Sequence, residues 1–382
     1  MGKSDSASSQ NIGDLVRAAR KAAGLRQADL SELTSLPSSH LSEIERGTTT
    51  PTIPTLRRLG QALNRPLEYF LQDSNRGPRS LGMVIQPTST GGQAATHFAS
   101  LVEAKTSGEV RLHLYHYSAL GSALDQVEAL IEGGISMYID ELHTMEPYAP
   151  WCGAVCLPYF FRDRPHYHRF LETTYFRQHI QEKLLETGIH ILDPISHWEC
   201  GSFEILYSRQ PIFHPDDLKG CKIRSYPSPV AAALRKALGA EPVVVEWAQV
   251  YQAFQQGDID AFLVPAAYFL ATGVQKLTSY ATLVRYGYTL NLTVFINRNE
   301  HLKLPPDYQK ALGEAMAEAS EFCTQLSKEL TEKDLARLTS EFGIPVIIPD
   351  ENDWRNRFEQ AIQKICDAGY LPPGIYRKLQ ES

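Results

Sequence analysis

Long hydrophobic runs are missing from this sequence of 382 residues. No stretch approaches the roughly 18 consecutive apolar residues that a membrane-spanning helix needs, so we expect no contact with a membrane. The first ten residues, MGKSDSASSQ, hold no apolar segment of a secretory signal. We therefore expect the protein to be cytoplasmic.

Cysteine is also scarce, with six residues at positions 152, 156, 200, 221, 323 and 366. They form no paired C-x-x-C motifs, which favours core thiols over a disulfide framework or a zinc site. His166 and His168 could clasp a metal on a strand, but on a helix they diverge, and Arg164 and Arg169 would repel a cation. We therefore expect neither a metal nor a cofactor.

Common catalytic motifs are absent too. The sequence holds no G-x-S-x-G, no H-E-x-x-H, no phosphate loop and no carboxylate dyad. An enzyme is thus the least favoured class, and we assign no catalytic residue.

The charge is unevenly distributed along a chain whose formal net charge is -7. Residues 1 to 80 carry 11 Lys and Arg against 8 Asp and Glu, or +3, which leaves -10 for the remainder. The length favours more than one domain, and the basic excess at one end indicates that the first domain has a different partner from the rest.

Apolar residues at helical spacing predict a bundle of short helices near the N-terminus. Gly24 and Gly47 provide stop signals, and Pro37 suits the first turn of a helix. No single helix can bury its apolar stripe alone, so the helices must pack together. The stripes comprise Ile12, Leu15, Val16 and Ala19, then Ala28, Leu30 and Leu33, then Leu41 and Ile44, then Leu56, Leu59 and Leu63, and finally residues 67 to 71.

These helices could belong to any small bundle, but their residues match a specific one. The segment GLRQADLSELTSLPSSHLSEIERGTTTPTIPTLRRLGQAL, residues 24 to 63, closely resembles the Cro/cI (XRE) type of helix-turn-helix. We assign this DNA-binding domain to residues 11 to 71, after a flexible leader at 1 to 10.

The resemblance implies a role for individual residues. Gln27, which opens the second helix, would contact a phosphate, and Arg20 would pair with Glu45 to tie the first helix to the third. A homodimer would bind double-stranded operator DNA at paired half-sites. The side chains that would face the bases are short and polar, so direct readout should be modest. They are Ser38, Ser39, Ser42 and Glu43.

Residues 72 to 80 read as a linker, because polar residues, Gly77 and Pro78 interrupt the apolar periodicity. Beyond it, predicted strands at 81–87, 109–115 and 135–140 alternate with predicted helices at 95–106 and 122–134. Such alternation predicts a parallel sheet with helices on both faces and a site beyond the carboxyl ends of its strands.

This second part resembles the solute-binding proteins of TRAP transporters, the DctP type. The matching pieces include SGEVRLHLYHYSALGS, LPYFFRD, PDDLKGCKIR, LGAEPVVVEWAQVYQAFQQGDIDA and LPPDYQKALGEAMAEA, in the order of the family. The resemblance implies a two-lobed ligand-binding domain, which we assign to residues 81 to 382. The predicted fold is an all-α helix-turn-helix domain followed by an α/β two-lobed domain.

The resemblance also implies a ligand site. Arg224, in the K-I-R run, would pair with a ligand carboxylate. Glu204 stands where many members of the family have a second arginine, and Val264 replaces a polar residue. A pocket with this charge pattern would prefer a zwitterion, or a cationic ring with a carboxylate, over a dicarboxylate. Possible apolar walls, which could equally be lobe core, are Trp198, Phe203 and Tyr226.

Together the two resemblances predict a one-component transcription regulator that senses a small carboxylate or zwitterionic metabolite. Closure of the lobes would act through the linker on the DNA-reading helices. The alternative is a ligand-binding module that the helix-turn-helix merely tethers to DNA, without coupling.

Overall fold

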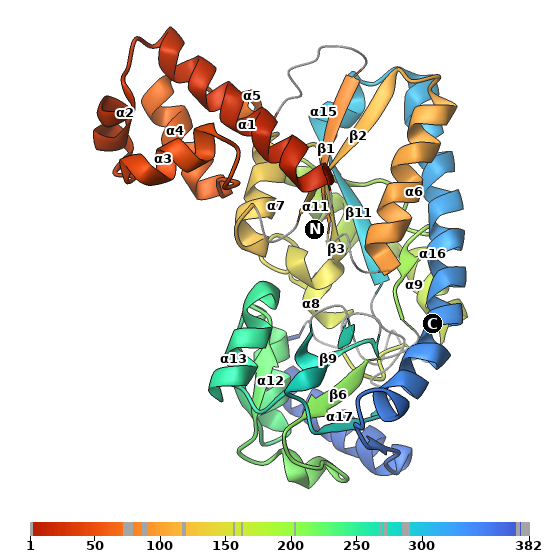
Figure 1. Cartoon of the computed structure of the whole chain (residues 1–382). Helices are drawn as coiled ribbons and strands as arrows, with labels where there is room; N and C mark the ends of the chain where they lie inside the picture. The colour runs from red at the N-terminus through yellow and green to blue at the C-terminus, as the bar shows by residue number, and fades with distance from the viewer. Residues whose placement is uncertain are drawn as a thin grey trace.

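The computed structural model describes residues 3–71, 79–85, 90–116, 120–155, 157–161, 163–201, 204–266, 269–270, 273–284, 291–371 and 375. A helical N-terminal domain sits beside a larger α/β part in which each of two lobes has its own sheet (Figure 1). Helix α16 (Pro306–Ser340), 35 residues long, runs along one side of the α/β part.

The N-terminal domain forms from the predicted helices, but not every residue of the predicted apolar stripes is buried. Leu30, Leu41, Ile44 and Leu59 are fully buried, as the apolar stripes require. In the second helix, by contrast, Ala28 is exposed and Leu33 is 61 % exposed. This short helix buries Leu30 and Thr34 instead. The helices are α1 (Lys3–Ala22), α2 (Gln27–Thr34), α3 (Ser38–Glu45), α4 (Ile53–Leu63) and α5 (Leu67–Leu71).

Helix α1 begins at Lys3, so it includes most of the stretch that we expected to be a flexible leader. No proline or glycine separates Lys3 from the apolar stripe of this helix, and nothing in that stretch ends the helical backbone. At the other end of the domain, positions 72–78 of the expected linker lie outside the described residues.

The first lobe is built on a mixed sheet of order β2-β1-β3-β11-β4, with β5 paired to β11. Strands β1, β2 and β3 are parallel and confirm the predicted alternation, whereas β11 enters antiparallel from a distant part of the chain. The elements are β1 (Arg79–Ile85), α6 (Thr90–Lys105), β2 (Val110–His116), α7 (Ala123–Glu132), β3 (Met137–Glu141), η2 (Leu142–Met145), α8 (Trp151–Ala154), α9 (Arg164–Leu171), α10 (Thr174–Phe176), η3 (Arg177–Gln181), α11 (Glu182–Glu186), β4 (Ile189–Ile191), β5 (Trp198–Glu199), β11 (Asn291–Asn297) and α15 (Arg298–Lys303).

The second lobe has a sheet of order β12-β10-β6-β9-β7-β8, in which β7 runs parallel to both β8 and β9. Its elements are β6 (Ile205–Ser208), η4 (Pro215–Leu218), β7 (Lys222–Ser225), α12 (Pro229–Ala237), β8 (Glu241–Val244), η5 (Trp247–Gln249), α13 (Val250–Gln256), β9 (Ala261–Val264), η6 (Val274–Lys276), β10 (Tyr280–Thr282), β12 (Val346–Ile347) and α17 (Glu351–Asp367).

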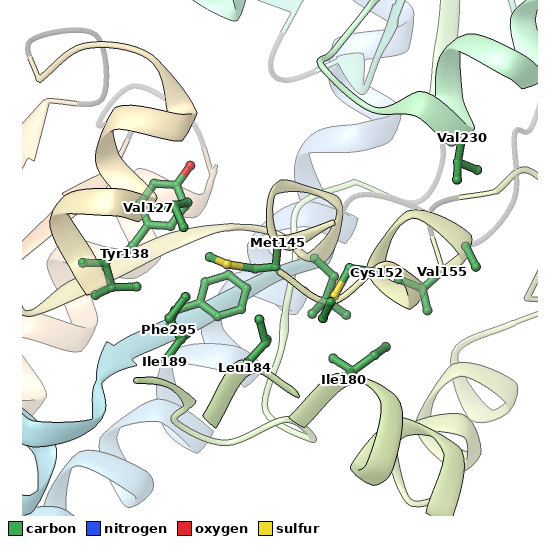
Figure 2. Close-up of a cluster of buried hydrophobic side chains, with 14 of the residues drawn as sticks. Val127, Tyr138, Met145, Cys152, Val155, Ile180, Leu184, Ile189, Val230 and Phe295 are labelled. Carbon is green, nitrogen blue, oxygen red and sulfur yellow. The ribbon is translucent and has the colours of Figure 1, made fainter. Parts of the chain in front are cut away.

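One cluster of buried apolar side chains continues from the N-terminal domain through the first lobe into the second. It includes Ile44 of α3, Val127 of α7 and Val230 of α12. Figure 2 shows its middle section, where Met145 lies between Tyr138 on one side and Cys152 on the other. Close packing of this kind resists independent movement of the parts that it joins.

Candidate functional site

A cavity of about 190 Å³ lies between the lobes, beside the ends of strands β3, β7 and β9. This is where open α/β sheets usually bind ligands, beyond the carboxyl ends of their strands. Ionisable groups from both lobes line it. The first lobe contributes Asp140, Glu141 and His143, and the second contributes Glu204, Arg224, Arg235 and Glu246.

Arg224 is held in the cavity wall by its neighbours. Its Nε donates a hydrogen bond of 3.1 Å to the carbonyl oxygen of Val245, and its guanidinium carbon lies 5.3 Å from the ring centroid of Trp247. The Val245 carbonyl and the aromatic ring together limit the rotation of the side chain. A guanidinium positioned in this way presents a planar set of donors, which suits a carboxylate.

Glu204 lies in the same cavity, just before β6. Burial, together with the charge of Glu141, raises the pKa of its carboxyl to about 7, although Arg235, Arg224 and His143 act in the opposite direction. A carboxyl with this pKa changes its protonation readily near neutral pH, so its state responds to any charged or hydrogen-bonding group that enters.

The lobes touch each other at the mouth of the cavity. The ring of His143, from the first lobe, lies 3.7 Å from the ring of Tyr226, from the second. Nearby, the backbone N–H of Val230 in α12 donates a hydrogen bond of 3.4 Å to the buried carboxylate of Glu146. The two lobes therefore contact each other directly beside the cavity.

The structure brings four of the expected ligand residues together and separates others. Arg224, Glu204, Tyr226 and Val264 all line the cavity. Trp198 does not, because its side chain is fully buried in the first lobe, where its ring packs edge-on against Phe98 in the hydrophobic core. Its role there is structural, and Phe203 lies outside the described residues.

Several lining residues escaped the sequence analysis. Trp247 lies within a segment that matched the family but was not assigned to the ligand site. Nothing in the sequence around His143 or Glu141 indicated that these residues would line a cavity. Arg235 looks in sequence like a solvated helix charge beside Lys236, yet its side chain is buried in the cavity wall. Only the packing of α12 against the second sheet shows that it points inward.

The expected DNA-reading residues lie on and beside α3. Ser38 and Ser39 are exposed at its first turn, and Ser42 and Glu43 are partly exposed one turn later. Gln27 is the first residue of α2, where a helix N-terminus favours contact with an anion.

Glu45 connects three helices of this domain and is itself 3 % exposed. Arg20 donates hydrogen bonds of 2.6 and 2.9 Å to its two carboxylate oxygens, which confirms the expected ion pair. The side-chain amide of Gln27 donates a further bond of 2.9 Å to Glu45. Burial opposes ionisation, but the hydrogen bonds from Arg20 and Gln27 outweigh it and hold the pKa of Glu45 below its usual value.

Two other expectations concern groups of residues. No helix in the described part of the chain is long and apolar enough to cross a membrane. The described ranges also contain no group of His, Cys, Asp or Glu side chains arranged to hold a metal. His166 and His168 lie on helix α9, and Arg164 donates a hydrogen bond of 3.3 Å to the Nε2 of His168.

Comparison with known sequences matches both parts of the chain. A helix-turn-helix family model matches residues 16–70, and the family described as bacterial extracellular solute-binding protein, family 7, matches residues 81–370. The C4-dicarboxylate-binding periplasmic protein DctP of Rhodobacter capsulatus is 31% identical over 264 residues, which cover 68% of this chain and 78% of that protein. The 2,3-diketo-L-gulonate-binding periplasmic protein YiaO of Escherichia coli is 29% identical over 276 residues, covering 72% and 82% respectively.

Solved structures show the same fold. A TRAP periplasmic solute-binding protein from Sulfurospirillum deleyianum, with bound succinate, has a TM-score of 0.71 and 25% identity and covers 80% of this chain and 99% of its own. One from Ochrobacterium anthropi, with bound L-fuconate, has a TM-score of 0.72 and 23% identity, with the same coverage.

Proposed function

Because this chain belongs to the bacterial extracellular solute-binding proteins of family 7 and carries a helix-turn-helix domain, we propose that it is a cytoplasmic transcription regulator that senses a small carboxylate. It binds its ligand without converting it, and it binds operator DNA as a homodimer. The observation that carries the coupling is that the helix-turn-helix domain packs directly on the lobe that lines the cavity.

The ligand part of the proposal rests on Arg224. Relatives are named for binding C4-dicarboxylates and 2,3-diketo-L-gulonate, and similar structures hold succinate and L-fuconate. All of these ligands are carboxylic acids. A guanidinium held by Val245 and Trp247 in the wall of the cavity is the group best suited to bind such an anion.

The DNA part of the proposal rests on the exposed start of α3. Ser38, Ser39, Ser42 and Glu43 would face base edges, and Gln27 would contact a phosphate. The buried ion pair of Glu45 with Arg20 fixes how α3 sits on α1, and thus the angle at which α3 enters the major groove.

Two backbone groups of the DNA-reading domain bond to the first lobe. The N–H of Ile53, at the start of α4, donates a hydrogen bond of 3.0 Å to the carbonyl oxygen of Leu120. The hydroxyl of Tyr115 in β2 donates one of 2.8 Å to the carbonyl oxygen of Leu71. Leu120 and Tyr115 are both buried, so the contact is a packed interface.

Helix α7 makes further contacts with the DNA-reading domain. Arg57 of α4 forms ion pairs with Glu128 at 2.9 Å and with Glu132 at 3.1 Å. At the end of α7, Leu67 approaches Gly134 so closely that a Cβ atom on Gly134 would lie 2.4 Å from the Leu67 side chain. The absence of a side chain at 134 therefore permits the contact.

The same helix also lines the cavity. Ala123 and Leu124, at the first turn of α7, line the cavity, and Ser122 caps that turn by accepting a hydrogen bond from the N–H of Asp125. One end of α7 thus contacts the cavity while its outer side holds the DNA-reading domain. A ligand that changes how the lobes close can bias the position of α7, and with it the reader, without requiring the expected route through the linker.

The test is a reciprocal titration. A carboxylate that raises the melting temperature is first selected from a panel of succinate, L-malate, L-fuconate and L-galactonate. A DNA duplex enriched by this protein from a random pool then reports DNA affinity, with and without that carboxylate. Linkage requires that the duplex change carboxylate affinity by the same factor, typically about 5- to 150-fold. Identical carboxylate affinity with and without the duplex would favour the tethered-module alternative.

A further inference from the structure

Glu146 follows η2 in the first lobe, but its carboxyl group lies at the start of α12 in the second lobe. Oε1 accepts the hydrogen bond of 3.4 Å from the N–H of Val230, the second residue of that helix. The residue is only 7 % exposed, and a Cβ atom on Gly153 of α8 would lie 2.5 Å from its Cδ. The carboxyl group is therefore packed between α8 of its own lobe and α12 of the other.

Two residues from different lobes satisfy the side-chain-capped donors at the start of α12. Ser228, the N-cap, accepts a hydrogen bond of 3.0 Å from the N–H of Ala231, and Pro229 has no N–H to satisfy. The N–H of Val230 is the donor that this cap leaves over, and Glu146 accepts it. If the lobes moved apart, Val230 would lose this acceptor.

The contact depends on the acceptor oxygen of Glu146 more than on its charge. Burial raises the pKa of this carboxyl group, and the hydrogen bonds from Ser228 and Val230 and the charge of His143 oppose the rise only in part. The site therefore does not favour the ionised form. A neutral side chain of the same length with an acceptor oxygen should serve equally well.

Glu146 is joined to the DNA-reading domain through η2 and α7. Met145, the residue before it, is fully buried and belongs to the same apolar cluster as Val127 of α7 and Val230 of α12 (Figure 2). Helix α7 in turn packs on α4, where Arg57 forms its ion pair with Glu128. Packed side chains thus connect Glu146 to the DNA-reading domain without a gap, and a displacement at one end is felt at the other.

The start of α12 is also close to the cavity. Tyr226 and Pro227, which directly precede the N-cap Ser228, line the cavity, and so does Arg235 within the helix. A ligand that contacts this wall can therefore shift α12 and, with it, the N–H group that Glu146 holds.

We propose that Glu146 is an interlobe latch, a positioning residue that passes the position of α12 through η2 and α7 to the DNA-reading domain. This inference rests on the proposed coupling between ligand and DNA, and it names the contact that carries the coupling from the second lobe. With the acceptor in place, movement of α12 carries Glu146 and η2 with it. Without the acceptor, the second lobe can move while α7 keeps its position.

Two substitutions of similar length separate the hydrogen bond from packing. Glu146→Met fills the space without an acceptor, whereas Glu146→Gln keeps an oxygen for Val230. In the full chain without ligand or DNA, Glu146→Met should make hydrogen exchange at the Val230 amide at least about fivefold faster, since one net hydrogen bond is worth about that factor. Exchange at the Ile53 amide, which bonds to Leu120 at the junction of the two domains, should also become faster. Glu146→Gln should leave both rates near those of the unaltered protein.

The controls address folding and side-chain length. Glu109→Met, at an exposed glutamate of the first lobe, should change neither exchange rate. Circular dichroism and the melting temperature establish that each variant is folded. If Glu146→Met unfolds, Glu146→Asp takes its place, because it keeps the carboxyl group but is one methylene too short to reach Val230, and it should show the same faster exchange.

The effect on regulation is measured with the carboxylate selected in the reciprocal titration. Glu146→Met should reduce the factor by which this carboxylate changes DNA affinity from the expected range of about 5- to 150-fold toward one, while Glu146→Gln retains it. DNA affinity without carboxylate should stay near that of the unaltered protein in both variants, because Glu146 lies outside the DNA-reading domain.

The outcomes separate this inference from the proposed function. The latch is wrong if Glu146→Met leaves exchange at Val230 unchanged, or if exchange rises at Val230 but not at Ile53, because the contact then does not reach the DNA-reading domain. Equal effects of Glu146→Gln and Glu146→Met would also overturn it, since the acceptor oxygen would then have no role. If no carboxylate of the panel changes the DNA affinity of the unaltered protein, the proposed function fails, whereas the two exchange rates still decide for or against the latch.

Discussion

The hydroxyl of Tyr115 donates a buried hydrogen bond of 2.8 Å to the carbonyl oxygen of Leu71. Tyr115 belongs to the ligand-binding lobe, and Leu71 is the last residue of the DNA-reading domain. The two domains are therefore joined by a specific contact at the point where the expected linker begins. Coupling through such a contact is stiffer than coupling through a flexible segment.

Replacement of Tyr115 by phenylalanine should loosen this junction. The change leaves the ring in place but removes the donor, so the Leu71 carbonyl becomes an unpaired buried acceptor at a cost of about 1 to 3 kcal/mol. We expect a lower melting temperature and a smaller effect of ligand on DNA affinity. Tyr251→Phe, on an exposed tyrosine of α13, is the control. An unchanged ligand effect in a destabilised variant would limit this bond to a structural role.

The ion pairs of Arg57 give a prediction about coupling that is sensitive to salt. Arg57→Glu would oppose like charges to Glu128 and Glu132, so the domains should separate more easily and the ligand effect on DNA affinity should shrink. Partly exposed pairs of this kind are worth about 0.2 to 1 kcal/mol each and weaken with salt. Arg58→Glu, on the exposed neighbour, is the matched control for the change in charge. If both variants lost the ligand effect equally, the loss would arise from the changed net charge of α4 and not from the ion pairs of Arg57.

Local pattern was sufficient to predict much of this fold. The helices of the reader and the first strands and helices of the first lobe follow from apolar periodicity and stop signals, which depend on nearby residues. The antiparallel entry of β11 beside β3 was not predicted, because it joins segments far apart in the chain. The docking of α4 on α7 was missed for the same reason.

The residues of the candidate site were likewise predicted only in part, because they come from segments far apart in the chain. Arg224, Glu204, Tyr226 and Val264 were found through resemblance to a family, and all of them line the cavity. Trp198 was expected to be a possible wall residue but lies in the core, since neighbours along a strand point to opposite faces. Arg235 was missed because a basic residue near the end of a helix usually faces solvent.

Loss of the Arg224 guanidinium should separate sensing from DNA binding. Arg224→Ala leaves a ligand carboxylate without its partner in the cavity, a loss on the order of 2 to 5 kcal/mol, or at least about thirtyfold in affinity. DNA binding without ligand should stay near that of the unaltered protein, because Arg224 lies in the second lobe, away from the DNA-reading domain. Arg224→Lys should recover only part of the affinity, since an ammonium cannot pair bidentately. DNA binding that still responded fully to the selected carboxylate would place that ligand elsewhere.

Acid should destabilise the DNA-reading domain through Glu45. The pKa of this carboxylate is lower in the folded state than in an unfolded chain, so its stabilisation is present above the usual pKa of glutamate. That stabilisation is lost as the pH falls through the folded-state value. Glu45→Gln should cost about 3 kcal/mol at neutral pH, because it leaves Arg20 buried without its counter-charge. The difference in unfolding free energy between Glu45→Gln and the unaltered protein should shrink in acid. The control Glu43→Gln, on the partly exposed face of the same helix, should be as stable as the unaltered protein at each pH. A loss of stability in Glu45→Gln that stayed the same at every pH would contradict this account.

Gln27 and Ser39 should affect DNA binding in different ways. Gln27→Ala removes an expected phosphate contact and should weaken binding to all sequences by a similar factor. Because Gln27 also donates to Glu45, its effect on folding must be separated by measuring the melting temperature, with Gln27→Glu as a variant that additionally brings a second carboxylate close to Glu45. Ser39→Ala should instead change the preference at one base pair by at most about 1 to 3 kcal/mol, because a single short side chain reaches one base edge. Weakening of binding to all sequences by Ser39→Ala would place α3 outside the major groove.

Footprints of the enriched duplex should show paired half-sites about one helical turn, roughly 34 Å, apart, because each chain of a homodimer places one α3 in the major groove. A single half-site bound by one chain would remove the homodimer from the proposal.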